Sequence, residues 1–180
     1  MTAQEIKGLA AAIHEAAVAK GFWDVEDAEK KHLAKMISEL GEVVQADRAG
    51  VMYEIERDGG KPEGVAAELA DFAMMSLDWL EEHVTTNHAE RVEDTLKELS
   101  KKIYAPMLKY PVYEMVVMFA RNWRHFKNHS TTHIDAVDAM YEMVGCIHFW
   151  LNGRGYDLWE LIREKMAYNA SRPKLHGRAY

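Results

Sequence analysis

The chain has 180 residues, of which 48% are hydrophobic and 28% charged, and its formal net charge is −7. This balance is typical of a globular protein with one core and argues against disorder. The negative charge argues against a surface that binds a nucleic acid polymer. The single cysteine, Cys146, excludes an internal disulfide. We found no pattern of a signal peptide and no apolar stretch of roughly 20 residues, so we expect a cytoplasmic protein without membrane contact.

Apolar residues at helical spacing dominate the first half of the chain. Thr2 and Glu5 form a capping-box pattern, and the helix they begin should end at Gly21. A second helix is predicted from near Asp24 to Gly50.

A turn at residues 58–60, Asp-Gly-Gly, separates the second helix from a third. Pro62 suits the first turn of that third helix, because the first turn does not need its missing N–H. The apolar stripe of this helix continues to Leu80.

Four more helices are predicted between Asn87 and Pro173, with Pro106 and Pro111 as breaks between the first two. They start at Asn87, at Val112, within 132–135 and at Asp157. No alternating pattern is long enough to predict a sheet. The expected fold is therefore all-α, an antiparallel helix bundle that forms a single domain over residues 1–180.

Residues 83–152 allow two interpretations. The apolar helices 66–80 and 136–151 both open with acids, which is compatible with an old duplication, but Tyr141 stands where the first copy has Asp71. The segment is then either a degenerate second half or an unrelated helical insertion.

Two acid pairs form the strongest chemical pattern. Glu39 and Glu42 lie in the second predicted helix, and Glu68 and Asp71 in the third. Residues three apart share one helix face. Glu42 lies roughly 12 Å before the end of its helix and Glu68 roughly 9 Å after Pro62, at 1.5 Å per residue. In an antiparallel hairpin the two pairs would therefore face each other.

Facing carboxylates repel one another unless a cation lies between them. Ligation by oxygen alone favours Mg²⁺, with Mn²⁺ as the alternative. A ferritin-like iron site would need Glu-x-x-His pairs, which neither acid pair forms. The alternative without a metal is that each pair belongs to a solvated helix face.

Basic residues gather at the end of the last predicted helix. From residue 163 onward there are five Lys or Arg residues and one acid, and Lys165, Asn169 and Arg172 share a helix face. Such a face could neutralise phosphates beside a metal site. It could also serve only the helix dipole.

Near the end of the first helix, His14 and Trp23 could clamp a nucleobase by stacking and hydrogen bonding. The alternative is that Trp23 packs in the core and His14 lies incidentally on the surface.

In this order the motifs resemble those of MazG-like nucleotide pyrophosphohydrolases, over about residues 5–82 and 153–178. The resemblance rests on Ile13-His14-Glu15, Lys20-Gly21-Phe22-Trp23, Ser38-Glu39-Leu40-Gly41-Glu42, Lys61-Pro62-Glu63-Gly64, Glu68-Leu69-Ala70-Asp71, Gly155-Tyr156-Asp157-Leu158, Lys165, Tyr168-Asn169, Arg172-Pro173 and His176-Gly177.

The resemblance implies the all-α NTP pyrophosphatase fold and hydrolysis of nucleoside triphosphates, often deoxy, to the monophosphate and pyrophosphate. It implies magnesium held by Glu39, Glu42, Glu68 and Asp71. Our hypothesis for the mechanism has two or three Mg²⁺ ions at these acids and a water that Glu39 orients for attack on the α-phosphorus. Lys165, Asn169 and Arg172 would meet the phosphates, and in the hypothetical mechanism Lys165 and Arg172 stabilise the charge on the departing pyrophosphate. His14 and Trp23 would line the base pocket.

Two features depart from the family pattern. Ser38 stands where members often have an acid before the first metal glutamate, and residues 83–152 intervene where short members run directly into the last helix. Short members assemble from several chains, so a homo-oligomer, a dimer or tetramer, is expected. The alternative functions are an all-α dUTPase-like enzyme and a non-catalytic nucleotide-binding or interaction protein.

Overall fold

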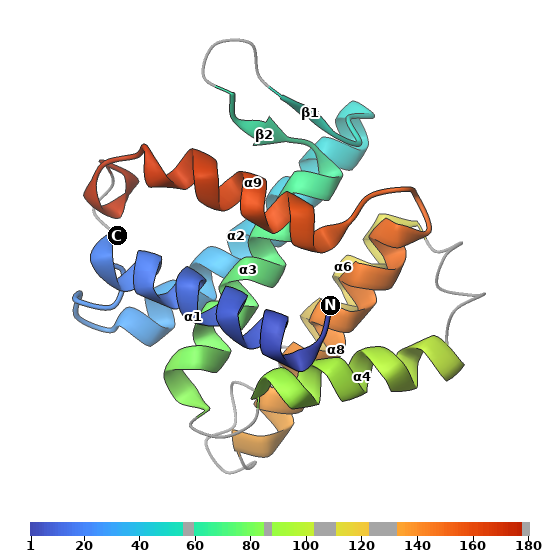
Figure 1. Ribbon diagram of the computed structural model, residues 1–180. Coiled ribbons are helices and arrows are strands. Elements are labelled where there is room, and N and C mark those ends of the chain that lie inside the picture. Colours follow the sequence, from blue (N-terminus) through green and yellow to red (C-terminus); the bar gives the residue numbers. More distant parts are fainter. Residues whose placement is uncertain (56–59, 85–87, 103–110, 123–132, 178–180) are drawn as a thin grey trace.

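The computed structural model describes residues 1–55, 60–84, 88–102, 111–122 and 133–177, and these are almost entirely helical (Figure 1). The helices are α1 (Ala3–Ala19), α2 (Ala28–Ala49), α3 (Val65–His83), α4 (His88–Lys102), α6 (Val112–Asn122), α8 (His133–Asn152) and α9 (Leu158–Ala170), followed by the 3₁₀ turn η1 (Lys174–Gly177). The strands β1 (Glu54–Ile55) and β2 (Pro62–Glu63) pair antiparallel. The all-α prediction is confirmed; the NTP pyrophosphatase type remains a prediction.

The helix starts differ from the sequence-based expectation in two places. α2 begins at Ala28 rather than near Asp24, because Asp27 adopts a left-handed conformation with φ 54°. Pro62 lies in β2 and not in the first turn of α3. The expected features at Asp58, Gly59, Asn87, Pro106 and Thr132 lie outside the described residues.

Gly64 explains why α3 starts after Pro62. Its φ is 99°, and a Cβ atom there would lie 2.9 Å from the carbonyl group of Met52. This close approach lets the carbonyls of Val51 and Met52 accept hydrogen bonds from the N–H groups of Val65 and Ala66. The connection thus caps the first turn of α3, whose N–H groups have no partner within the helix.

α3 is the central helix of the bundle, and α1, α2, α8 and α9 pack against it (Figure 1). Most of its residues are buried, including Leu69, Phe72 and Trp79. α2 runs antiparallel to α3, because Glu39 lies beside Glu68 while the earlier His32 reaches the carbonyl of the later Met75. The start of α2 therefore faces the end of α3.

The helices between residues 83 and 152 share the core of α3. Val92 of α4, Phe119 of α6 and Met140 of α8 are buried in one hydrophobic cluster with Phe72. The rings of Phe72 and Phe119 stack with centroids 5.4 Å apart. The choice between a degenerate second half and an insertion stays open.

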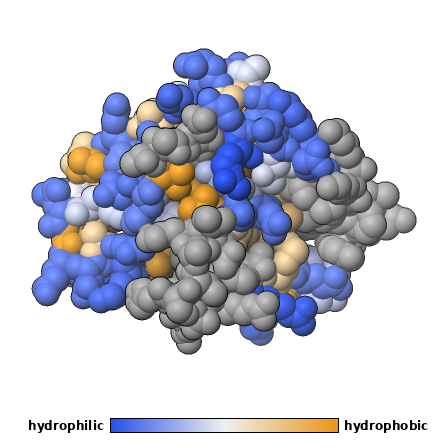
Figure 2. Space-filling view, turned by 90° about the horizontal axis from the view of Figure 1, so that it is seen from below, coloured by the Kyte–Doolittle hydropathy of each residue, from blue (hydrophilic) through white to orange (hydrophobic). Residues whose placement is uncertain are grey.

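Hydrophilic residues cover most of the coloured surface in Figure 2, and hydrophobic residues form small separate patches there. Among the described residues, none of the helices combines the length and apolar character that a bilayer crossing requires.

Phe119→Ala tests whether α6 is part of the common core. The side chain is fully buried, so its removal should lower the free energy of unfolding by about 3–5 kcal/mol. Chemical denaturation followed by circular dichroism should still show one transition. Two separate transitions, with the first alone shifted, would mean that the helices of 83–152 unfold independently of α3.

Candidate functional site

Three of the four predicted metal ligands converge between α2 and α3. Carboxylate oxygens of Glu39, Glu42 and Glu68 all lie within 4.8 Å of one another. Glu39 and Glu68 are only 3% exposed, and Glu42 is partly exposed. The antiparallel packing of two helices, each with carboxylates three residues apart, produces this cluster.

Asp71 lies beside the cluster but is not part of the group of three. Its Oδ2 is 2.6 Å from Nζ of Lys165, which is 3.8 Å from Oε1 of Glu68. Lys165 is buried and also donates to the carbonyl of Pro62 at 3.0 Å. Lys35 forms an ion pair with Glu39 on the cluster's other side. Two ammonium groups therefore balance the acids.

The donor set fits a hard divalent cation. Burial, together with the neighbouring Asp71 and Glu42 and against the effect of Lys165, raises the pKa of Glu68 to about 7. Oδ1 of Asp71 is buried and accepts no hydrogen bond from any residue that the structure describes. A buried acceptor without a partner and a carboxylate destabilised by its neighbours would both be stabilised by a cation. Glu39, Glu42, Glu68 and Asp71 would hold it through oxygen.

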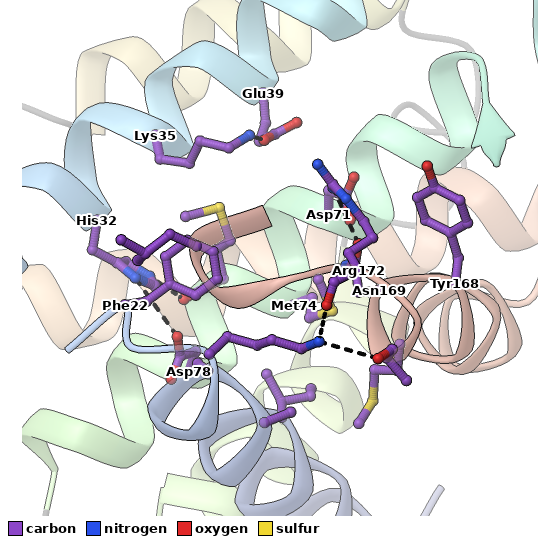
Figure 3. Close-up of a pocket in the computed structure, with 18 of the residues that line it drawn as sticks. Phe22, His32, Lys35, Glu39, Asp71, Met74, Asp78, Tyr168, Asn169 and Arg172 are labelled. Atoms are coloured by element: carbon purple, nitrogen blue, oxygen red, sulfur yellow. Dashed lines mark hydrogen bonds and ion pairs between the residues drawn. The ribbon is translucent and has the colours of Figure 1, made fainter. Parts of the chain in front are cut away.

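A cavity of about 530 Å³ opens beside the acids (Figure 3). Arg172, Asn169 and Tyr168 line one side of it, and Nη1 of Arg172 donates to Oδ1 of Asn169 at 3.4 Å. Asp71 lies on this same side (Figure 3). The structure thus places Arg172 and Asn169 on the wall of the same cavity as the acids, and their contact with phosphates stays a prediction.

Lys165 is placed differently from the predicted cationic face. It is not among the residues that line the cavity, because its ammonium group is buried against Asp71 and Glu68. The cations that do line the cavity include Lys35 and Lys61. Sequence reasoning missed both, although Lys35 precedes Glu39 by one helical turn and Lys61 belongs to the motif at 61–64.

Lys20 fixes the position of the Arg172 segment. From the end of α1, its Nζ donates to the carbonyl of Ala170 at 3.1 Å and to that of Arg172. Its own carbonyl accepts from the N–H of Leu175 at 2.9 Å. These bonds satisfy carbonyls at the end of α9 and hold it against α1.

His14 and Trp23 meet at the carboxylate of Asp78 rather than in the cavity lining. Nδ1 of His14 donates to Oδ1 of Asp78 at 2.8 Å, and Nε1 of Trp23 donates to the same oxygen at 3.1 Å. Asp78 lines the cavity, whereas His14 and Trp23 are not among its lining residues. Their predicted contact with a base stays a prediction.

Phe22 and His32 are two further aromatic side chains on the cavity wall, on the side of Asp78 (Figure 3). The ring of His32 stacks on Trp23 with centroids 4.9 Å apart. Sequence reasoning missed both residues. The available signal was that His32 lies seven residues, two helical turns, before Glu39 on the same face.

No family model, curated protein or solved structure matches the chain. The resemblance to MazG-like enzymes therefore rests on the quoted sequence motifs alone.

Lys165→Met tests the charge balance of the cluster. Breaking a buried ion pair should lower the free energy of unfolding by roughly 3–5 kcal/mol in a metal chelator. The loss should be larger at pH 8 than at pH 6, because a protonated Glu68 needs no counter-charge. Lys30→Met, which removes a surface pair with Asp27, is the control and should change stability little. Equal small losses in both variants would contradict the predicted role.

Asp78→Asn tests the two opposed titrations at the cavity wall. Burial raises the pKa of Asp78 from 3.8 to about 6, so its contribution to stability falls as the pH rises from about 4 to 6. Burial lowers the pKa of His32 from 6.5 to about 4, so its contribution rises over about pH 4–6.5. The two slopes oppose each other in the wild type.

In Asp78→Asn, the pH dependence that His32 gives to the free energy of unfolding should no longer be offset by that of Asp78. Between pH 4 and 6, the free energy of unfolding of Asp78→Asn should rise faster than that of the wild type, by up to roughly 1.4 kcal/mol per pH unit. Urea denaturation at several pH values measures this. Parallel curves for the two proteins would contradict it.

Proposed function

We propose that this protein is a Mg²⁺-dependent nucleoside triphosphate pyrophosphohydrolase, which releases pyrophosphate and leaves a monophosphate. The observation that carries the proposal is the convergence of Glu39, Glu42 and Glu68 beside a cavity whose wall carries Arg172. A polyanion needs both features, a cation held by carboxylates and a guanidinium for the remaining charge. The quoted motifs support the same reading.

The metal-binding residues proposed are Glu39, Glu42, Glu68 and Asp71, with Mn²⁺ as a substitute for Mg²⁺ and two or three ions in total. When bound, the metal would neutralise phosphate oxygens and lower the pKa of water. Lys35 and Lys165 balance the negative charge of these acids. A bound metal ion would add further positive charge beside the two ammonium groups. Lys35 lines the cavity and could then turn toward a phosphate.

In the proposed reaction, water attacks the α-phosphorus and the bond from this phosphorus to the bridging α,β oxygen breaks. Glu39 orients the water and accepts its proton, because it lies in the acid cluster at the cavity wall. Arg172, held by Asn169, stabilises the negative charge that develops on the departing pyrophosphate. Lys165 does not line the cavity, and its role in the reaction is to hold the carboxylates of Glu68 and Asp71 in position.

The non-catalytic alternative also has an observation in its favour. Lys35 and Lys165 already pair with the acids, so the cluster could be a purely structural charge network. An all-α dUTPase-like enzyme remains the alternative within the hydrolases. A homo-oligomer and a cytoplasmic location are further parts of the proposal, and mass measurement in solution tests the first.

Pyrophosphate release from each natural dNTP and NTP, with Mg²⁺ added and withheld, tests the function. The wild type should release pyrophosphate only with the metal. Glu68→Gln should lower kcat by about 100-fold or more while the circular dichroism spectrum stays unchanged, because one metal ligand has lost its charge.

Glu142→Gln is the matched control, since Glu142 is exposed on α8 and lies outside the cavity lining. It should retain wild-type activity. No pyrophosphate from any nucleotide at high protein concentration would exclude the enzyme and favour the charge network. Release from dUTP alone would favour the dUTPase-like reading.

A further inference from the structure

Two hydrogen-bond acceptors lie side by side on the cavity wall, away from the acid cluster. Nδ1 of His32 and Oδ2 of Asp78 are 3.6 Å apart, and each side chain is only 6% exposed. Both residues line the cavity. Figure 3 shows them with Phe22 on the side opposite Asn169 and Arg172.

The tautomer of His32 follows from its other ring nitrogen. Nε2 lies 2.9 Å from the carbonyl of Met75, which can only accept, so Nε2 carries the proton. Burial lowers the pKa of His32 to about 4, so the ring is neutral near pH 7 and Nδ1 is left with its lone pair. Nδ1 therefore cannot donate to Asp78.

Oδ2 of Asp78 also has a lone pair on the side of Nδ1 of His32. Within the described part of the chain, Oδ1 of Asp78 accepts from His14 and Trp23, and its Oδ2 has only a longer bond, 3.3 Å, from Trp23. Burial raises the pKa of Asp78 to about 6, so the group is mainly a carboxylate above that pH. Two neighbouring lone pairs repel each other unless a donor lies between them.

An amino group with two N–H bonds fits this pair, because it can donate one hydrogen to each acceptor. We propose that Nδ1 of His32 and Oδ2 of Asp78 together bind the exocyclic amino group of the substrate's base. The preferred substrates are then triphosphates of cytosine, adenine or guanine, and those of uracil and thymine are disfavoured, since a carbonyl would add a third acceptor.

The position in the fold agrees with this assignment, which rests on the proposed function. His32 precedes Glu39 by seven residues on α2, and Asp78 follows Asp71 by seven on α3. Each spacing is about 10 Å along its helix. The acceptor pair thus lies two turns from the acids, where a base would lie if the phosphates met the metal.

The experiment compares pairs of nucleotides that differ at the exocyclic group. For dCTP against dUTP, dATP against dITP and dGTP against dITP, kcat/KM should favour the amino member by about tenfold or more in at least one pair. The pair that shows the preference identifies the base. Equal values within all three pairs would overturn the proposal.

Asp78→Asn should abolish the preference. His14 and Trp23 hold the amide oxygen, so its nitrogen would donate to Nδ1 of His32 and no acceptor pair would remain. His32→Phe keeps the ring stack on Trp23 and removes Nδ1, so it tests the same point if Asp78→Asn does not fold. Glu82→Gln is the control, because Glu82 contacts the far side of His14 at 3.3 Å without lining the cavity. A preference retained in Asp78→Asn or in His32→Phe would overturn the proposal.

Binding of α,β-methylene analogues of the same nucleotides, measured by calorimetry, separates the two proposals. A preference for amino bases without pyrophosphate release would support the acceptor pair and overturn the enzyme. Pyrophosphate release from the triphosphates of all bases with equal kcat/KM would support the enzyme and overturn the acceptor pair. No binding of any analogue, with no release, would overturn both.

Discussion

The need to balance buried negative charge governs the arrangement of this molecule. Glu39 and Glu68 are almost fully enclosed between α2 and α3, where an isolated carboxylate would be strongly destabilised. Lys35 approaches from within α2 and Lys165 from α9. The second ammonium group comes from the last helix, which returns to α2 and α3 after the long segment 83–152.

The acid pairs and the helical class were predictable from the sequence because both depend on local spacing. Carboxylates three residues apart must share a helix face, and the caps and apolar stripes set the approximate ends of α1, α3 and α9. The acid pairs and the helix ends needed no knowledge of how distant helices pack. The position of Arg172 and Asn169 relative to the acids does depend on that packing, and the sequence indicated it only through the resemblance.

The rest depended on packing between elements far apart in the chain. The sequence does not show whether the ammonium group of Lys165 lies on an exposed cationic face or is buried against the acids. The tertiary structure shows that it is buried against Asp71. His14 and Trp23 were recognised as a pair, but Asp78, the group that joins them, lies more than 50 residues away. The short strands at Glu54 and Pro62 carry no alternation, so periodicity could not predict them.

The bonds of Lys20 have a consequence for how such a site could diversify. They fasten the tail of the polypeptide to its opening helix, while the acids lie on the hairpin between. One wall of the cavity is therefore assembled from the end of α1 and the segment that follows Lys165 in α9, so substitutions at residues 168–172 would alter this wall while the carboxylates stay on α2 and α3.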